Sequence, residues 1–162
     1  MRKLTLRDDT AYFDCVDDEL NDYIWYQAKD QQLEGAAVTY LAAYDNQTVG
    51  FTSLTMSSLQ IGYVSRWHLP RKTYSQFPAL LIARLATDYE YQHQGVGTTL
   101  CQFAIAKAIE HRNGLGCQFV ILNAKPNSIR FYEKLGFETC AGQSASRRNI
   151  FMYFKLPPEP NT

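Results

Sequence analysis

The hydrophobic positions near the start of the chain change their spacing from two to between three and four. Residues 3–7 alternate between apolar and polar side chains, as a half-buried strand does. Within residues 20–28 the apolar positions recur at intervals of three and four, which is the spacing of one helix face. Asp14 or Asp17 precedes that stretch as a candidate N-cap. The pattern predicts a strand followed by a helix.

Two β-rich runs follow, and a longer apolar run comes after them. Residues 39–44 and 48–56 are separated by Asp45-Asn46-Gln47, which is turn chemistry and predicts an antiparallel hairpin. Residues 57–78 show no sustained period and predict a long loop. Residues 79–86 are almost continuously apolar, as a strand covered on both faces is. We therefore expect this strand to be central in its sheet.

The next part of the chain alternates between helix and strand. The apolar stripe of residues 100–109 predicts a helix that ends near Asn113-Gly114, and residues 118–122 predict a buried strand. Residues 79–122 therefore read as strand, glycine turn, helix and strand. This order predicts a βαβ unit with a right-handed crossover.

The pattern closes with a helix, a strand and a tail. Residues 126–135 begin with proline and are followed by Gly136, which fits a helix with a left-handed stop. Residues 149–156 predict the last strand, and the proline-rich residues 157–162 predict a disordered tail. Because no linker or repeat interrupts the pattern, we expect one α/β (α+β) domain over residues 1–156.

Composition excludes several classes of protein. The 162 residues are 46% hydrophobic and 20% charged, which is ordinary for a globular protein. No segment approaches the roughly 20 apolar residues of a membrane span, and no signal-peptide pattern follows Met1, so we expect a cytoplasmic protein with no membrane partner. The four cysteines lack CxxC spacing. We interpret them as buried apolar residues, so the pattern does not support zinc or another metal.

Charge is divided unevenly along the chain. Residues 1–50 contain 4 basic and 10 acidic residues, whereas residues 51–162 contain 12 and 6. An anionic ligand would be attracted to a site in the second part. One hypothesis is a phosphate-binding surface for RNA with Trp67 available for stacking, made by Arg66, His68, Arg71, Lys72, Arg84, Arg147 and Arg148. The alternative is an ordinary mixed surface, since a pI of about 6.8 is not typical of nucleic-acid binders.

The segment Gln92-His93-Gln94-Gly95-Val96-Gly97 directly follows the predicted central strand and opens the next helix. Backbone N–H groups that glycine leaves unobstructed converge on a phosphate in such a turn, and the helix N-terminus adds partial positive charge. The segment lacks the Lys-Ser/Thr pair of a Walker loop and the third glycine of a dinucleotide fingerprint. We interpret it as a pyrophosphate site; the alternative is a plain strand-to-helix turn.

A second element, Phe131-Tyr132-Glu133-Lys134-Leu135-Gly136-Phe137, follows later in the chain. With the turn, it resembles the Gcn5-related N-acetyltransferase (GNAT) superfamily, whose motifs read Q/R-x-x-G-x-G/A and FYxxxGF. Both occur in that order, 34 residues apart from Gly97 to Phe131, and the resemblance covers residues 2–156. It implies the GNAT fold, a mixed central sheet of about six to seven strands flanked by about four helices. It also implies an N-acetyltransferase whose cofactor is acetyl-CoA.

The resemblance implies roles for the matching residues. Tyr132 would lie near the cofactor sulfur and protonate the departing thiolate as general acid; a core tyrosine is the alternative. Many family members have an asparagine where this chain has Lys125, so either Lys125 or Asn127 would contact the cofactor. Asp88 and Glu90 are candidates to accept the amine proton through water. The remaining cofactor-binding residues would be Leu85, Ala86 and Thr87 along the pantetheine arm, and Gln92, His93, Gln94, Gly95, Val96, Gly97 and Thr98 around the pyrophosphate.

A closer likeness is to the acetyltransferase toxins of bacterial toxin–antitoxin modules, which act on the amino group of aminoacyl-tRNA. It implies aminoacyl-tRNA as acceptor, a small antitoxin protein as partner, and a homodimer. Two alternatives stay open: an acetyltransferase for a small amine or a protein N-terminus, and a non-catalytic acyl-CoA-binding regulatory module, against which Tyr132 argues. The likeness is carried by residues 13–15, 19–23, 81–88, 91–97 and 124–125.

Overall fold

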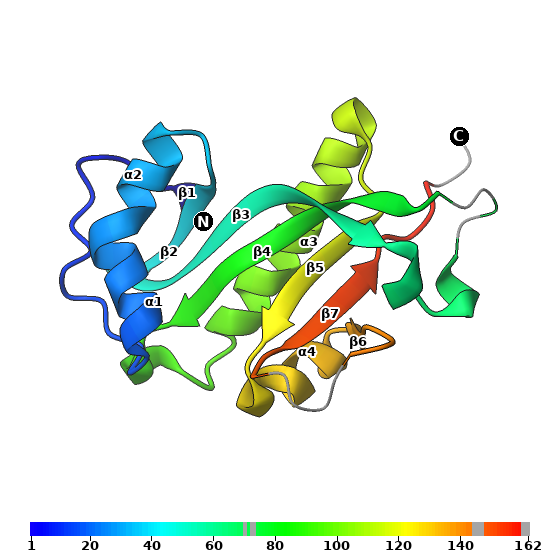
Figure 1. Ribbon diagram of the computed structural model, residues 1–162. Helices are drawn as coiled ribbons and strands as arrows, with labels where there is room; N and C mark the ends of the chain where they lie inside the picture. Colours follow the sequence, from blue (N-terminus) through cyan, green and yellow to red (C-terminus); the bar gives the residue numbers. More distant parts are fainter. Residues whose placement is uncertain (70, 72–73, 144–147, 160–162) are drawn as a thin grey trace. The chain divides into compact units, whose positions relative to one another are not determined.

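The computed structural model describes residues 1–69, 71, 74–143 and 148–159. These residues form a seven-stranded sheet in the order β1-β2-β3-β4-β5-β7-β6 (Figure 1). The mixed α/β class and the central place of the strand at residues 79–86, which is β4, are confirmed. The chain divides into two compact units, Met1–Thr55 with Ile82–Ala104 and Met56–Leu81 with Ile105–Thr162. The expectation of a single domain stays a prediction.

The first unit contains the N-terminal elements and one end of three long ones. β1 pairs with β2, and β2 with β3, both antiparallel. The elements are β1 (Arg2–Lys3), α1 (Asp18–Asp22), the π-helical turn η1 (Tyr23–Gln27), α2 (Ala28–Leu33), β2 (Val38–Tyr44) and η4 (Tyr89–Tyr91), with parts of β3 (Gln47–Gln60), β4 (Gln76–Thr87) and α3 (Val96–Leu115).

The predicted hairpin and its turn are confirmed, whereas the first strand is shorter than predicted. Asp45 and Asn46 have φ values of 48° and 61°, which is the pattern of a type I′ turn. β1 ends at Lys3. The chain then turns because the Asp8 carboxylate accepts hydrogen bonds from the Thr5 N–H (2.7 Å) and hydroxyl (2.9 Å). Leu6, predicted to continue the strand, is therefore exposed.

Helix α1 begins at the predicted cap. The Asp17 side chain accepts a hydrogen bond from the Leu20 N–H (3.2 Å). The helices then place Tyr23 over the sheet, where its ring stacks on Phe51 at 5.9 Å between centroids and its hydroxyl is 2.7 Å from the Ser53 hydroxyl. This packing forms the core of the first unit.

The second unit contains three predicted elements from the C-terminal part of the chain: the buried strand β5, the short helix α4 and the last strand β7. β5 pairs antiparallel with β7, from Phe119 opposite Lys155 to Ala124 opposite Ile150, and β6 pairs with β7. The two-residue strand β6 gave no pattern to predict. The elements are the 3-10 turns η2 (Ile61–Tyr63), η3 (Arg66–His68) and η5 (Pro126–Ser128), then β5 (Phe119–Ala124), α4 (Ile129–Lys134), β6 (Glu138–Thr139) and β7 (Ile150–Lys155), with the remaining parts of β3, β4 and α3.

The loop predicted at residues 57–78 is shorter than expected. β3 runs on to Gln60 and β4 begins at Gln76, so Pro78 lies inside a strand. Pro78 has no backbone N–H to donate, but its carbonyl accepts a hydrogen bond from the Gln118 N–H at 2.9 Å. The strand–helix–strand order of β4, α3 and β5 is as predicted, and Gly136 ends α4 with a φ of 93°.

All four cysteines are free and buried, as predicted: Cys15, Cys101, Cys117 and Cys140. Burial raises the pKa of the Cys101 and Cys140 thiols to about 12. In the described part of the chain, no helix is both long and apolar enough to cross a membrane.

Candidate functional site

The first turn of α3 presents unpaired backbone donors. The helix begins at Val96, and the Thr99 N–H and hydroxyl both donate to the Gly95 carbonyl at 3.0 Å. The N–H groups of Val96, Gly97 and Thr98 come before the first bond of the helix ladder, so they have no acceptor within the helix. They stand at the positive end of a 20-residue helix. This arrangement suits an anion.

The turn before α3 is held in a specific backbone conformation. Gly95 has a φ of 86° and His93 a φ of 61°, both in the left-handed region. Two side-chain amides brace the turn: Gln92 Nε2 donates to the Thr87 carbonyl (3.4 Å) and Gln94 Nε2 to the Glu90 carbonyl (3.0 Å). A Cβ at Gly95 would meet nothing within 4 Å, so conformation rather than packing requires glycine there.

The end of β4 lies directly against this helix start. A Cβ on Gly50 of β3 would come within 2.9 Å of Val96 Cγ1 and Leu100 Cδ1, and 3.0 Å of the Ala86 carbonyl oxygen. Gly50 therefore lets β3, β4 and the first turn of α3 approach closely. The structure thus brings together the predicted cofactor residues 85–87 and 92–98, while the motif search missed Gly50.

Asp88 connects the turn to the N-terminal segment. One carboxylate oxygen accepts from the Asp14 N–H (3.1 Å) and the other from the Glu90 N–H (3.0 Å). The Tyr89 N–H returns a bond to the Asp14 carbonyl at 2.8 Å. Asp88 is buried. Both of its oxygens are engaged in fixing the approach to α3, whereas the other candidate proton acceptor, Glu90, is exposed.

Tyr132, Lys125 and Asn127 belong to the second unit. Tyr132 is 8% exposed on α4, with its ring 4.9 Å from Phe131 and 5.7 Å from Phe137, centroid to centroid. Lys125 is half-buried at the start of η5, and Asn127 is exposed within η5. α4 is thus anchored by its aromatic residues.

The basic residues of the RNA hypothesis do not all share one environment. Arg66, Trp67, Arg71 and Arg148 of the second unit are exposed. Arg84 belongs to the first unit, where its guanidinium lies 5.2 Å from the centre of the Tyr23 ring and donates to the Ala83 carbonyl. Lys72 and Arg147 lie outside the described residues.

The His68 side chain helps to attach the 3-10 turn η3 to the strands beside it. Its Nδ1 is 3.1 Å from the Tyr153 hydroxyl, which accepts from the Ser65 N–H (3.1 Å) and donates to the Glu138 carboxylate (3.0 Å). Burial chiefly raises the pKa of Tyr153. This cluster attaches η3, and with it the exposed Arg66 and Trp67, to β6 and β7.

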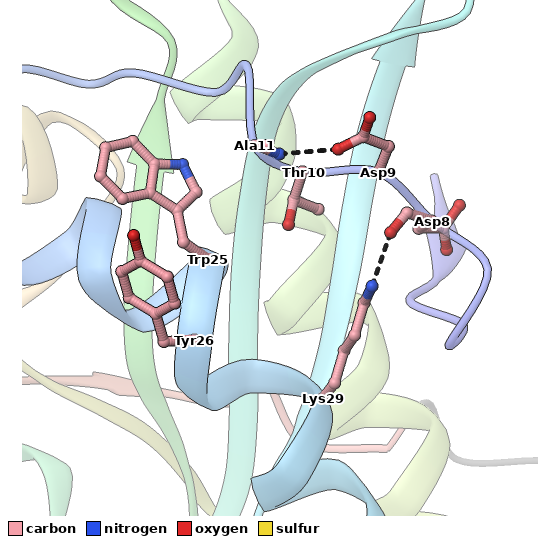
Figure 2. A pocket seen from close by; sticks show the side chains of 7 residues that line it. All are labelled: Asp8, Asp9, Thr10, Ala11, Trp25, Tyr26 and Lys29. Atoms are coloured by element: carbon pink, nitrogen blue, oxygen red, sulfur yellow. Dashed lines mark hydrogen bonds between the residues drawn. The ribbon is translucent and has the colours of Figure 1, made fainter.

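A pocket of about 270 Å³ lies between the segment 8–11 and the helices of the first unit (Figure 2). Figure 2 shows the Lys29 ammonium pointing to the backbone of Asp8, where it donates to the carbonyl at 2.6 Å; it also donates to the Leu6 carbonyl. Trp25 Nε1 donates to the Phe13 carbonyl (2.9 Å). These side chains hold the N-terminal segment against the helices, so we assign the pocket a structural role.

The described elements follow the order predicted for an acetyltransferase fold: a central strand, a glycine turn, a long helix, a strand and a short aromatic helix. Residues 3–137 match the acetyltransferase (GNAT) family, and the chain belongs to that family. The predicted family, fold and enzyme class are thereby confirmed.

Among known proteins, the chain is similar to a tRNA-acetylating toxin of Mycobacterium tuberculosis, with 25% identity over 85% of this chain and 82% of that protein. The fold matches the toxin AtaT complexed with acetyl-methionyl-tRNAfMet, with a TM-score of 0.79, 24% identity and coverage of 93% and 91% of the two chains. It also matches a tyrosine-to-phenylalanine mutant of AtaT bound to the C-terminus of the antitoxin AtaR and acetyl-CoA (TM-score 0.77, 21% identity, 96% and 91% covered).

Proposed function

We propose that the protein transfers an acetyl group from acetyl-CoA to the α-amino group of an aminoacyl-tRNA. The observation that carries the proposal is the start of α3, where Gly95 lies in the left-handed region and unpaired N–H groups follow it. This is an acyl-CoA pyrophosphate site in a chain that belongs to an acetyltransferase family.

The cofactor binds along the end of β4 and the start of α3. Residues 92–98 hold the pyrophosphate, and the backbone of residues 85–87 pairs with the pantetheine arm. Many family members have an asparagine where this chain has Lys125, and either Lys125 or, in its place, Asn127 contacts the cofactor. The electrostatic attraction of a helix N-terminus for an anion supports this assignment.

The reaction is a direct attack of a neutral amine on the thioester carbonyl. Negative charge gathers on the carbonyl oxygen, and CoA departs as a thiolate. The pKa of an ordinary thiol is about 8.5. Tyr132 donates its phenol proton to that thiolate as general acid.

The acceptor assignment follows from the chemistry of the amine and from the relatives. An α-amino group has a pKa of about 8, so a useful fraction is neutral at pH 7 without a strong base. The pKa of a lysine side chain is about 10.4, so a lysine acceptor would need a base. Both oxygens of Asp88 are already engaged by backbone donors, so an acceptor that needs little help is favoured. The tRNA-acetylating toxin of Mycobacterium tuberculosis supports the same class of substrate.

The proposal is tested by locating the transferred group. Labelled acetyl-CoA is incubated with the protein and total charged tRNA, and the label is expected on the α-amino group of the amino acid. Deacylated tRNA and free amino acids serve as controls. If the label appears only on polyamines, small amines or protein N-termini, the acceptor assignment is wrong; if CoA is bound and never released as product, the enzyme assignment is wrong.

Tyr132→Phe tests the general acid. Because the ring and its aromatic neighbours are retained, acetyl-CoA affinity should stay the same while kcat falls by about 10²- to 10⁴-fold. Tyr74→Phe, which removes an exposed hydroxyl of the same unit, is the matched control and should retain full activity. Full activity of Tyr132→Phe would remove this tyrosine from the mechanism.

We further propose a cytoplasmic homodimer that a small antitoxin protein restrains. The solved complex of AtaT with the C-terminus of AtaR supports the kind of partner. Expression of the protein alone should arrest growth, and coexpression of a small antitoxin protein that binds it should restore growth. Sedimentation of the purified protein tests the dimer, and a monomer at micromolar concentration would contradict it.

A further inference from the structure

A second pocket, in the second unit, lies outside every site described above. Its volume is about 290 Å³, and Ser58, Gln60, Tyr63, Asn123 and Phe151 line it. These residues supply two amides, two hydroxyls and two aromatic rings, and among them there is no carboxylate, ammonium or guanidinium. Such a lining fits an uncharged, flat group that has hydrogen-bond donors and acceptors on its edge.

Asn123 is the unusual member of this set. It is the one exposed residue of β5, whose other five residues are buried. The same strand ends at Ala124, one residue before Lys125 of the proposed cofactor site. Ser58 and Gln60, both exposed at the end of β3, add further hydrogen-bonding groups to the pocket.

The aromatic wall is held in place before any ligand binds. The Phe151 N–H donates to Gln143 Oε1 and its carbonyl accepts from Gln143 Nε2, both at 2.7 Å. The Tyr63 ring packs edge to face on Phe151 at 5.7 Å, and the Tyr63 carbonyl accepts from the Ala141 N–H (3.2 Å). A preformed wall lowers the entropic cost of binding.

We infer that this pocket binds an unpaired nucleobase of the acceptor RNA, and that the base is adenine. Asparagine and glutamine amides pair with two edge atoms of adenine, and aromatic side chains stack on unpaired bases. Exposed arginines stand near in the chain, Arg66 three residues after Tyr63 and Arg148 three before Phe151, and supply charge for the neighbouring phosphates. The inference rests on the proposed function, because a charged tRNA carries its amino acid on a terminal unpaired adenosine.

The test compares two charged RNA hairpins that differ only in the 3′-terminal nucleotide, adenosine in one and an abasic ribose in the other. The wild-type protein should acetylate the adenosine probe with the higher kcat/KM. Asn123→Ala or Gln60→Ala should lower kcat/KM for that probe by about tenfold, the size expected for one lost bidentate contact, and leave the abasic probe unchanged. Asn149→Ala, an exposed asparagine outside the pocket, is the control. Equal loss on both probes, or equal wild-type rates on the two, would overturn the inference.

A binding measurement without chemistry separates this inference from the proposed function. The two hairpins, uncharged, are titrated into the protein in the absence of acetyl-CoA. Tighter binding of the adenosine hairpin that Asn123→Ala abolishes supports the pocket even if no aminoacyl-tRNA is acetylated. Equal affinity of both hairpins for the wild-type protein overturns the pocket even if aminoacyl-tRNA is the acceptor.

Discussion

Gly95 shows how a single backbone conformation determines the geometry of the proposed pyrophosphate site. An L-residue at its φ of 86° costs about 1–2 kcal/mol, although a Cβ there has space. The turn would relax to relieve this strain, and the N–H groups that follow would no longer converge. The residue type is predictable from the sequence motif, whereas the positive φ of His93 two residues earlier is not, because few residues other than glycine adopt that region.

Gly95→Ala should therefore weaken acetyl-CoA binding by about tenfold or more while the protein stays folded. Gly35→Ala is the matched control, since Gly35 belongs to the same unit, has a φ of 75° and also has nothing within 4 Å of a Cβ. Both variants should lose about 1–2 kcal/mol of stability. Calorimetric titration with acetyl-CoA distinguishes them, and an unchanged affinity of the Gly95 variant would remove the turn from the cofactor site.

Asp8 links the stability of the N-terminal segment to pH. The hydrogen-bonded Arg2 guanidinium, with the Thr5 donors, lowers the pKa of Asp8 below its ordinary value. Because the folded state binds this proton less readily than the unfolded state, the stabilisation is fully present above pH of about 4 and is lost as the pH falls further.

Asp8→Asn should thus destabilise the protein by about 1 kcal/mol at pH 7, and the difference from wild type should shrink below pH of about 4. Urea unfolding at a series of pH values measures it. Asp9→Asn is the control, as Asp9 has no ion pair among those found in the described residues. A difference that does not depend on pH would contradict the role of the charge.

At the scale of elements, hydrophobic period predicts the long helices and strands, and side-chain interactions decide where they end. The apolar run of β4 and the stripe of α3 are read correctly because each is long. β1 ends early through Asp8, and β4 extends past Pro78, because local hydrogen bonds override the pattern. Asn123 stands in a strand whose hydrophobic period gives no sign of a pocket that distant segments complete.

The turn η3 depends on one buried hydroxyl. Tyr153→Phe removes the acceptor of the Ser65 N–H and the donor to Glu138, while the ring packing on Phe119 stays. The Ser65 amide should then exchange its hydrogen about tenfold faster, which corresponds to about 1.4 kcal/mol of lost local stability. Tyr63→Phe, which keeps the ring pair with Phe151, is the control. Unchanged exchange at Ser65 would show that other contacts hold the turn.

At the scale of the whole molecule, the formal charge is 0, yet acidic residues are in excess over the first 50 residues and basic residues over the rest. Composition therefore hides the basic part of the chain. The sequence shows this division. The RNA hypothesis also grouped Arg84 with Arg66 and Arg148, whereas the structure places the Arg84 guanidinium over the Tyr23 ring.

Association with charged tRNA should weaken as salt rises, with a slope set by the number of phosphate contacts. Arg66→Ala and Arg148→Ala should each reduce the slope of log K against log salt by about 0.7–0.9. Lys107→Ala, whose ammonium is paired with Glu110, should leave it unchanged. Fluorescence anisotropy between low and moderate salt provides the slopes, and identical slopes for all four proteins would argue that these arginines do not meet RNA.

The rate at which the four buried cysteines react with a thiol reagent measures how often the fold opens. A protonated, inaccessible thiol does not react with alkylating reagents, so each label incorporated records an opening event. Cys15 and Cys101 belong to the first unit, and Cys117 and Cys140 to the second. Mass spectrometry of peptides labelled over time would therefore reveal whether the two units open together or one at a time, and whether acetyl-CoA slows one before the other.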